Sequence, residues 1–156
     1  IAFGIGVASV PMVGMAMGAG QVARARQVAW VAGGVSAFNL ALIGAVVTWA
    51  PDLWARLFTQ DEAVLSHARQ YLVTAGPAFA FFGLGLTLYF ASQGAGQVIG
   101  PVLAGTVRLV LVAAAGYWLS QHQGTADDFY QLVAVAMVLY GVVTAAAVKF
   151  TPWGRG

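Results

Sequence analysis

The sequence lacks cysteine, and charged residues make up only 8% of its 156 positions. Without cysteine, the chain can form neither a disulfide framework nor a thiolate metal site. Its five acidic and seven basic residues are too few to coat a soluble domain, which has about 25% charged residues on average. The bases are scattered, so no nucleic-acid-binding patch is expected. His67 and His122 stand alone, and we expect no metal site.

Catalytic patterns are also missing. No Ser-His-Asp arrangement, paired membrane carboxylate or nucleotide-binding fingerprint is present, and Asp127 and Asp128 are interpreted as a solvated loop pair. Since no cluster of titratable residues converges, we predict that the protein is not an enzyme and carries no resident cofactor.

Apolar residues account for 60% of the chain and fall into long runs separated by short polar turns. The second run has 23 uncharged residues, which as a helix would extend about 34 Å, enough to cross a hydrocarbon core of roughly 30 Å. The pattern predicts an all-α membrane protein, a bundle of about five transmembrane helices. The predicted helices cover residues 1–17, 28–50, 70–92, 98–120 and 129–148.

One pentapeptide occurs twice. Gly-Ala-Gly-Gln-Val stands at 18–22 and again at 94–98, each time at the end of an apolar run. Two crossings separate the copies, so both turns are expected on one side of the membrane. The pattern fits glycine capping that arose twice; the alternative is a weak trace of a duplicated unit.

The basic residues predict the orientation. Five crossings place Arg24, Arg26, Lys149 and Arg155 on one side, and Arg56, Arg69 and all five acids on the other. By the positive-inside rule the first side is cytoplasmic, and it carries the C-terminus. We therefore expect a multi-pass protein of the cell (inner) membrane.

Arg108 is the most informative single residue, because it stands inside an apolar run. An arginine near the bilayer centre costs about 2.5–3.5 kcal/mol on insertion scales. Its side chain must face protein or water, or extend (snorkel) toward the membrane surface. Its role is either structural, in helix packing, or functional, in a transport cavity. No acid occurs in any of the five runs, so its partner is a carbonyl, a polar side chain, lipid phosphate or an acid elsewhere.

Other candidates for a substrate cavity are aromatic or flexible. Phe81, Phe82 and Tyr89 share one side of the third predicted helix, and Met12 offers an adaptable surface. For each of them, ordinary helix or lipid packing is the alternative. Asn39 is expected to bond a neighbouring helix.

The glycine turn and its arginines, Val13-Gly14 followed by Gly18-Ala-Gly20-Gln-Val-Ala-Arg24-Ala-Arg26, resemble the cytoplasmic loop of multidrug and toxic compound extrusion (MATE) transporters. Met15 stands where that family usually has glutamine. Leu57-Phe-Thr-Gln-Asp61, the second glycine turn with Gly94 and Gly96, Pro101 and Arg108 follow in the family's order.

The resemblance implies that residues 1–156 are part of the second, C-terminal lobe of a two-lobe, twelve-helix transporter, with the N-terminal lobe missing. The apolar residues at the start of the chain agree with a helix that begins upstream. The implied activity is export of multidrug-type, xenobiotic or metabolite substrates by proton- or sodium-coupled antiport with alternating access.

The implied partners are membrane lipid, small lipophilic or cationic substrates and the missing lobe, which would hold most of the coupling-ion site. The alternatives are a lipid-linked saccharide flippase of the same superfamily, which would have a more cationic cavity, and a non-transporting membrane fragment.

Overall fold

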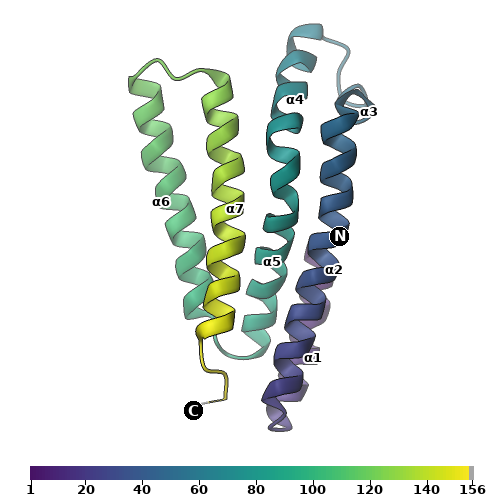
Figure 1. Cartoon of the computed structure of the whole chain (residues 1–156), viewed down its shortest axis with the longest axis vertical. Helices are drawn as coiled ribbons and strands as arrows, with labels where there is room; N and C mark the ends of the chain where they lie inside the picture. Colours follow the sequence, from purple (N-terminus) through teal and green to yellow (C-terminus); the bar gives the residue numbers. More distant parts are fainter. Residues whose placement is uncertain (155–156) are drawn as a thin grey trace.

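A computed structural model describes residues 1–154, and this part of the chain is helical throughout, with short turns and no strand (Figure 1). The predicted all-α architecture is confirmed. The elements are α1 (Ala2–Gly18), α2 (Val22–Trp49), α3 (Pro51–Ala55), α4 (Glu62–Ala75), the 3-10 turn η1 (Gly76–Ala78), α5 (Phe79–Gly94), α6 (Ile99–Gln121) and α7 (Ala126–Phe150).

Four helical segments of the described chain are long and apolar enough to cross a membrane: α2, the continuous stretch Glu62–Gly94, α6 and α7. The first predicted span corresponds to α1, which is apolar but has 17 residues. A helix of that length extends about 25 Å, which is shorter than a hydrocarbon core of roughly 30 Å. The chain is therefore a membrane protein with four long helices and one shorter apolar helix.

Helix boundaries extend beyond the apolar runs. Helix α2 begins at Val22 rather than 28, and α4 begins at Glu62 rather than 70. The reason is local, because polar residues at a helix end leave the membrane without ending the helix. At α4, the Asp61 carboxylate accepts the Ala63 N–H at 2.9 Å and caps the first turn. Arg24 and Arg26 consequently lie in the first turns of α2, not in a loop.

The two glycine turns have the same geometry. After α1, the Gly20 N–H bonds the Met17 carbonyl at 2.9 Å and the Gln21 N–H bonds the Ala16 carbonyl at 2.8 Å. After α5, Gly96 and Gln97 repeat this pattern of bonds at 3.0 and 2.9 Å. The φ angle is 71° at Gly20 and 68° at Gly96. Both are Schellman caps, whose left-handed residue favours glycine, in agreement with glycine capping as the origin of the repeat.

Helix α5 lies at the centre of the packing and contacts α1, α2 and α7. Small residues allow this close approach: a Cβ on Gly94 would overlap the Val10 carbonyl of α1. Ser36 on α2 donates a 3.1 Å hydrogen bond to the Gly83 carbonyl of α5. The prediction for Asn39 is wrong, because its amide bonds the Val35 carbonyl of its own helix.

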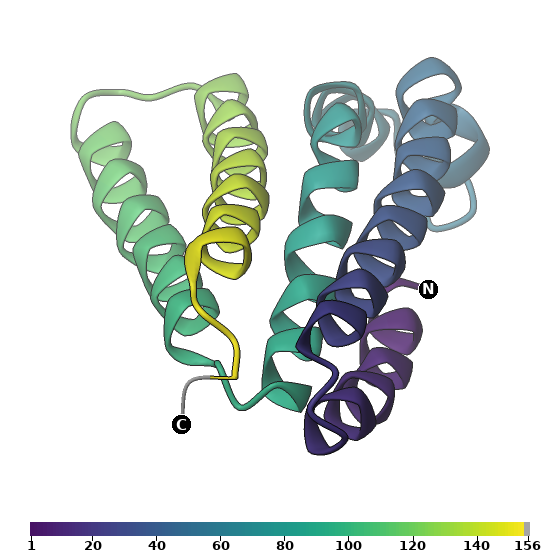
Figure 2. The same ribbon diagram turned by 60° about the horizontal axis from the view of Figure 1, so that its bottom comes forward.

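Helix α6 packs mainly against α7 and contacts α5 little. In Figure 2 these two helices stand together on one side of the molecule, and α1, α2 and α5 group on the other. Most of the α6 surface is exposed, with large apolar side chains at Leu103, Val107, Leu109 and Val110. Such a surface suits contact with lipid or with further helices.

The ends of the bundle agree with the predicted topology. The α1–α2 turn, the α5–α6 turn and the end of α7 lie at the bottom of Figure 1, and α3 and the α6–α7 loop lie at the top. The short helix α3 begins with Pro51 in its first turn, and the side chain of the nearby Trp54 is exposed. Arg155, which entered the orientation prediction, lies outside the described residues. Which end faces the cytoplasm stays a prediction.

Candidate functional site around Arg108

Arg108 is the tenth residue of α6 and is half-buried. At 1.5 Å per residue its Cα lies about 14 Å along the axis from the first residue of the helix and about 20 Å from the last. This position is well inside a bilayer core of roughly 30 Å. The Cα of Arg108 therefore lies in the middle part of a helix that is long and apolar enough to cross a membrane.

Two aromatic rings hold that guanidinium. Its central carbon lies 5.4 Å from the ring centre of Phe82 on α5 and 5.5 Å from that of Tyr140 on α7. The two rings are themselves neighbours, with centroids 6.2 Å apart. Arg108 thus joins three helices, although α5 and α6 otherwise touch little.

No carboxylate in the described chain pairs with Arg108, whose side chain makes none of the ion pairs found there. The five acids lie in α3 or at the starts of α4 and α7. Each cation–π contact contributes about 0.5–1 kcal/mol when exposed and about 2 when desolvated. Two contacts therefore offset much of an insertion cost of about 2.5–3.5 kcal/mol.

Beside Arg108 is an open hollow of about 330 Å³, lined by Gly105, Leu109 and Val112 of the same helix. Gly105 leaves space one turn before the arginine, because a Cβ added there would meet nothing closer than the Tyr140 ring at 4.0 Å. A guanidinium has five N–H donors in a planar fork. The rings of Phe82 and Tyr140 make cation–π contacts with the guanidinium. Its N–H donors have no hydrogen-bond acceptor within the described residues.

The other aromatic candidates, Phe81 and Tyr89, are not the rings that contact the Arg108 guanidinium. Phe81 is 39% exposed and lines an apolar hollow of about 370 Å³ between η1, α5 and α7. Tyr89 packs edge-on against Phe90, with ring centroids 5.7 Å apart. Of the three aromatic residues named from the sequence, only Phe82 contacts Arg108. Tyr140 was missed, because no spacing within one helix reveals a partner on another.

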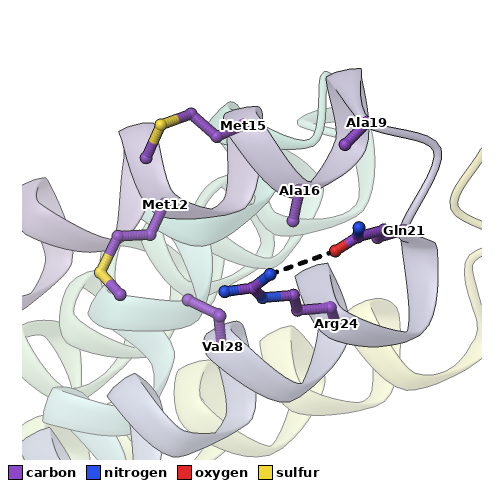
Figure 3. Close-up of a pocket in the computed structure, with 7 residues that line it drawn as sticks. All are labelled: Met12, Met15, Ala16, Ala19, Gln21, Arg24 and Val28. Atoms are coloured by element: carbon purple, nitrogen blue, oxygen red, sulfur yellow. Dashed lines mark hydrogen bonds between the residues drawn. The ribbon is translucent and has the colours of Figure 1, made fainter.

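Met12 lines a separate groove beside the first glycine turn. Met15, Ala16 and Ala19 line it from the α1 side, and Gln21, Arg24 and Val28 from the α2 side, around a volume of about 300 Å³ (Figure 3). Arg24 is exposed and donates one 3.3 Å hydrogen bond to Gln21. The predicted cavity residues are therefore distributed over several hollows.

Arg26 has a different environment from Arg24, two residues away. It donates to the carbonyls of Lys149, at 3.1 Å, and Thr151. Its guanidinium also lies 5.5 Å from the ring centre of Trp153, which is 6% exposed. These contacts connect the start of α2 to the end of α7. The positive charge of Arg26 also complements the negative, C-terminal end of the α7 dipole.

Gly18, Gly20, Gly94 and Gly96 form the two caps described above and line none of these hollows. Within residues 1–154, no group of three or more His, Asp or Glu side chains could hold a metal ion.

The guanidinium of Arg108 and the two rings beside it could recognise a charged group and stack against an aromatic ring.

A comparison with protein-family models gives a match to the family MatE over residues 1–118. This range contains both glycine turns, Phe82 and Arg108. No match was found among curated proteins or among solved structures.

Proposed function

The chain belongs to the MatE family of membrane transporters, and from this premise we propose that it is part of a cation-coupled exporter of small lipophilic molecules. The observation that carries the proposal is the family match over residues 1–118, supported by the long apolar helices. We assign residues 1–156 to the second lobe of a transporter whose two lobes alternate access to a central cavity.

The coupling ion is proposed to be a proton or sodium. Within the described chain, the acids stand at helix ends and none lies at the depth of Arg108. The coupling carboxylate is accordingly assigned to helices outside these residues. Antiport would then require the first lobe as a partner, with membrane lipid around both.

The proposed location is the cell membrane, with the glycine turns and the C-terminus in the cytoplasm. Residues 1–156 contain no cysteine, so single cysteines introduced into them, with the unsubstituted protein as the background control, test the orientation by labelling. A membrane-impermeant maleimide should label Gln60→Cys in intact cells and should leave Gln97→Cys unlabelled until the membrane is opened. The reverse pattern would invert the proposed orientation.

Efflux from an exporter-deficient bacterial strain tests the activity. The complete reading frame that contains this chain is expressed, and loss of preloaded rhodamine 123 and of fluorescein is followed after energisation. Faster loss than in vector-only cells, abolished by a protonophore or by removing sodium, is the expected result. Export of neither dye nor of a wider panel, with the protein present in the membrane, would refute the proposal.

The flippase alternative predicts several cations at membrane depth. Within the described helices, Arg108 stands alone at that depth, so this alternative gains no support.

A further inference from the structure

The Arg108 cluster carries an inference about substrate charge, which rests on the proposed function. Aromatic faces at membrane depth could bind flat organic cations. At Phe82 and Tyr140, however, a guanidinium already lies over both rings, at 5.4 and 5.5 Å. A cationic solute would meet a charge of the same sign there, so these rings are poor receptors for it.

The same arrangement suits an anion. The guanidinium is planar and matches a carboxylate with two parallel N–H donors. No described carboxylate pairs with it. The open hollow of about 330 Å³, whose lining residues include Gly105 and Leu109 of α6, provides room for an apolar body.

Lipid phosphate is the less suitable anion. Arg108 lies about 14 Å along α6 from the nearer helix end, and its side chain is held sideways by α5 and α7 instead of extending toward the interface. A phosphate would have to leave the headgroup region to reach it. A small solute that enters the transport cavity has no such restriction.

We propose that Arg108, with Phe82 and Tyr140, forms a binding site for a small aromatic or lipophilic solute that carries a carboxylate. The carboxylate pairs with the guanidinium, and the ring system lies in the hollow along Gly105 and Leu109. Arg108 thereby selects anionic over cationic substrates.

Binding to the purified complete transporter tests this site independently of transport. Fluorescein and rhodamine 123 are suitable probes, because they share a xanthene ring system and differ in charge. Fluorescence anisotropy should show tighter binding of fluorescein to the wild type by at least about tenfold, a ratio equivalent to about 1.4 kcal/mol. Tighter binding of rhodamine 123 would overturn the proposal.

Substitutions at Arg108 and at a control arginine test whether the preference for fluorescein depends on Arg108. Arg108→Gln should weaken fluorescein binding about tenfold or more and should leave rhodamine 123 binding equal or tighter. Arg56→Gln is the matched control, because Arg56 is exposed and has only a 3.9 Å contact with Asp52; it should change neither affinity. Equal fluorescein affinity in Arg108→Gln and wild type would refute the site.

Arg108→Lys keeps the inference testable if the glutamine variant does not fold. It retains the charge and should retain preference for fluorescein, although the lost planar fork weakens binding. A reversed preference in this variant would count against the charge argument.

Nanodiscs of zwitterionic and of anionic lipid distinguish the source of the anion, at high ionic strength to screen the surface potential. Equal fluorescein affinity in both supports a solute site. Loss of binding in anionic lipid alone would show that an anionic lipid headgroup occupies Arg108 and would overturn the proposal. If fluorescein binds as expected and no dye is exported, the proposed function fails and the binding site stands.

Discussion

Replacing Arg26 by alanine should release the end of α7 from the start of α2. The arginine donates to the carbonyls of Lys149 and Thr151, which are 123 and 125 residues away in sequence. It also contacts the ring of Trp153, a buried member of the cluster around Val13 and Leu88. This one side chain therefore connects the last helix to the first helical pair.

The size of the effect follows from these contacts. Hydrogen bonds to a charged group contribute about 1.5–3 kcal/mol each when buried, and partial exposure reduces this to about 1 kcal/mol each. The contact with Trp153 adds about 0.5–1 kcal/mol. Arg26→Ala should thus lower the free energy of unfolding by about 2–3 kcal/mol, and with it the melting temperature.

Arg24→Ala is the matched control. Arg24 is an exposed arginine of the same helical turn, and its one hydrogen bond is a 3.3 Å contact to Gln21. A contact of this kind contributes less than about 0.5 kcal/mol. The two alanine variants and wild type are purified in the same detergent and heated at one scan rate, because membrane proteins often unfold irreversibly.

Trypsin gives a second measurement, because it cleaves after Lys149. Arg26→Ala should speed this cleavage, whereas Arg24→Ala should leave it at the wild-type rate. Arg26→Lys should be intermediate, since an ammonium cannot reproduce the planar fork. Equal melting temperatures and equal cleavage rates for the two alanine variants would refute the inferred role of Arg26.

Three further predictions concern the turns. Gly20→Val should destabilise the protein by about 1–2 kcal/mol, because φ is 71° there. Gly18→Val is the control and should have little effect on the melting temperature, because a Cβ added at Gly18 meets nothing within 4 Å. Thr125→Ala should lower the free energy of unfolding by about 1 kcal/mol, since the Thr125 hydroxyl donates a hydrogen bond to the Asp128 carboxylate in the first turn of α7. An unchanged melting temperature would contradict this role. The Arg69 guanidinium hydrogen-bonds Asp52 and lowers the pKa of that carboxyl below 3.8. The pair's stabilisation is therefore present above pH 3.8 and is lost as the pH falls through the lower folded pKa. Amide protection over residues 52–55, after correction for the intrinsic pH dependence of exchange, should then fall in wild type but not in Asp52→Asn, and a parallel response in both would exclude the pair.

Much of the fold was predictable from sequence because its rules are local. A helix in lipid satisfies its own backbone hydrogen bonds, so each long apolar run specifies one helix. The repeated Gly-Ala-Gly-Gln-Val predicted both turns, because a Schellman cap involves only consecutive residues. Helix ends were placed less well: Val22 begins a helix inside a stretch expected to be a polar connection. Hydropathy predicts the part of a helix that lies in the membrane, and the helices extend beyond that part.

The candidate site was predictable only in part. Arg108 was identified because a lone charge in an apolar run is unusual. Its partners were not all identified, because Phe82 and Tyr140 come from two other helices. The prediction for Asn39 failed for the same reason, since sequence alone does not fix which face of a helix meets a neighbour.

From the order of amino acids alone it follows that this protein lies in a membrane, roughly where its helices occur and which two turns require glycine at a left-handed position. Those properties depend on composition and on residues a few positions apart. The contacts of Arg108 with Phe82 and Tyr140, and the bonds from Arg26 but not Arg24 to the end of α7, became visible once the helices were packed together. These contacts depend on how each helix is rotated against its neighbours, and that rotation is set by the packing of all the helices together.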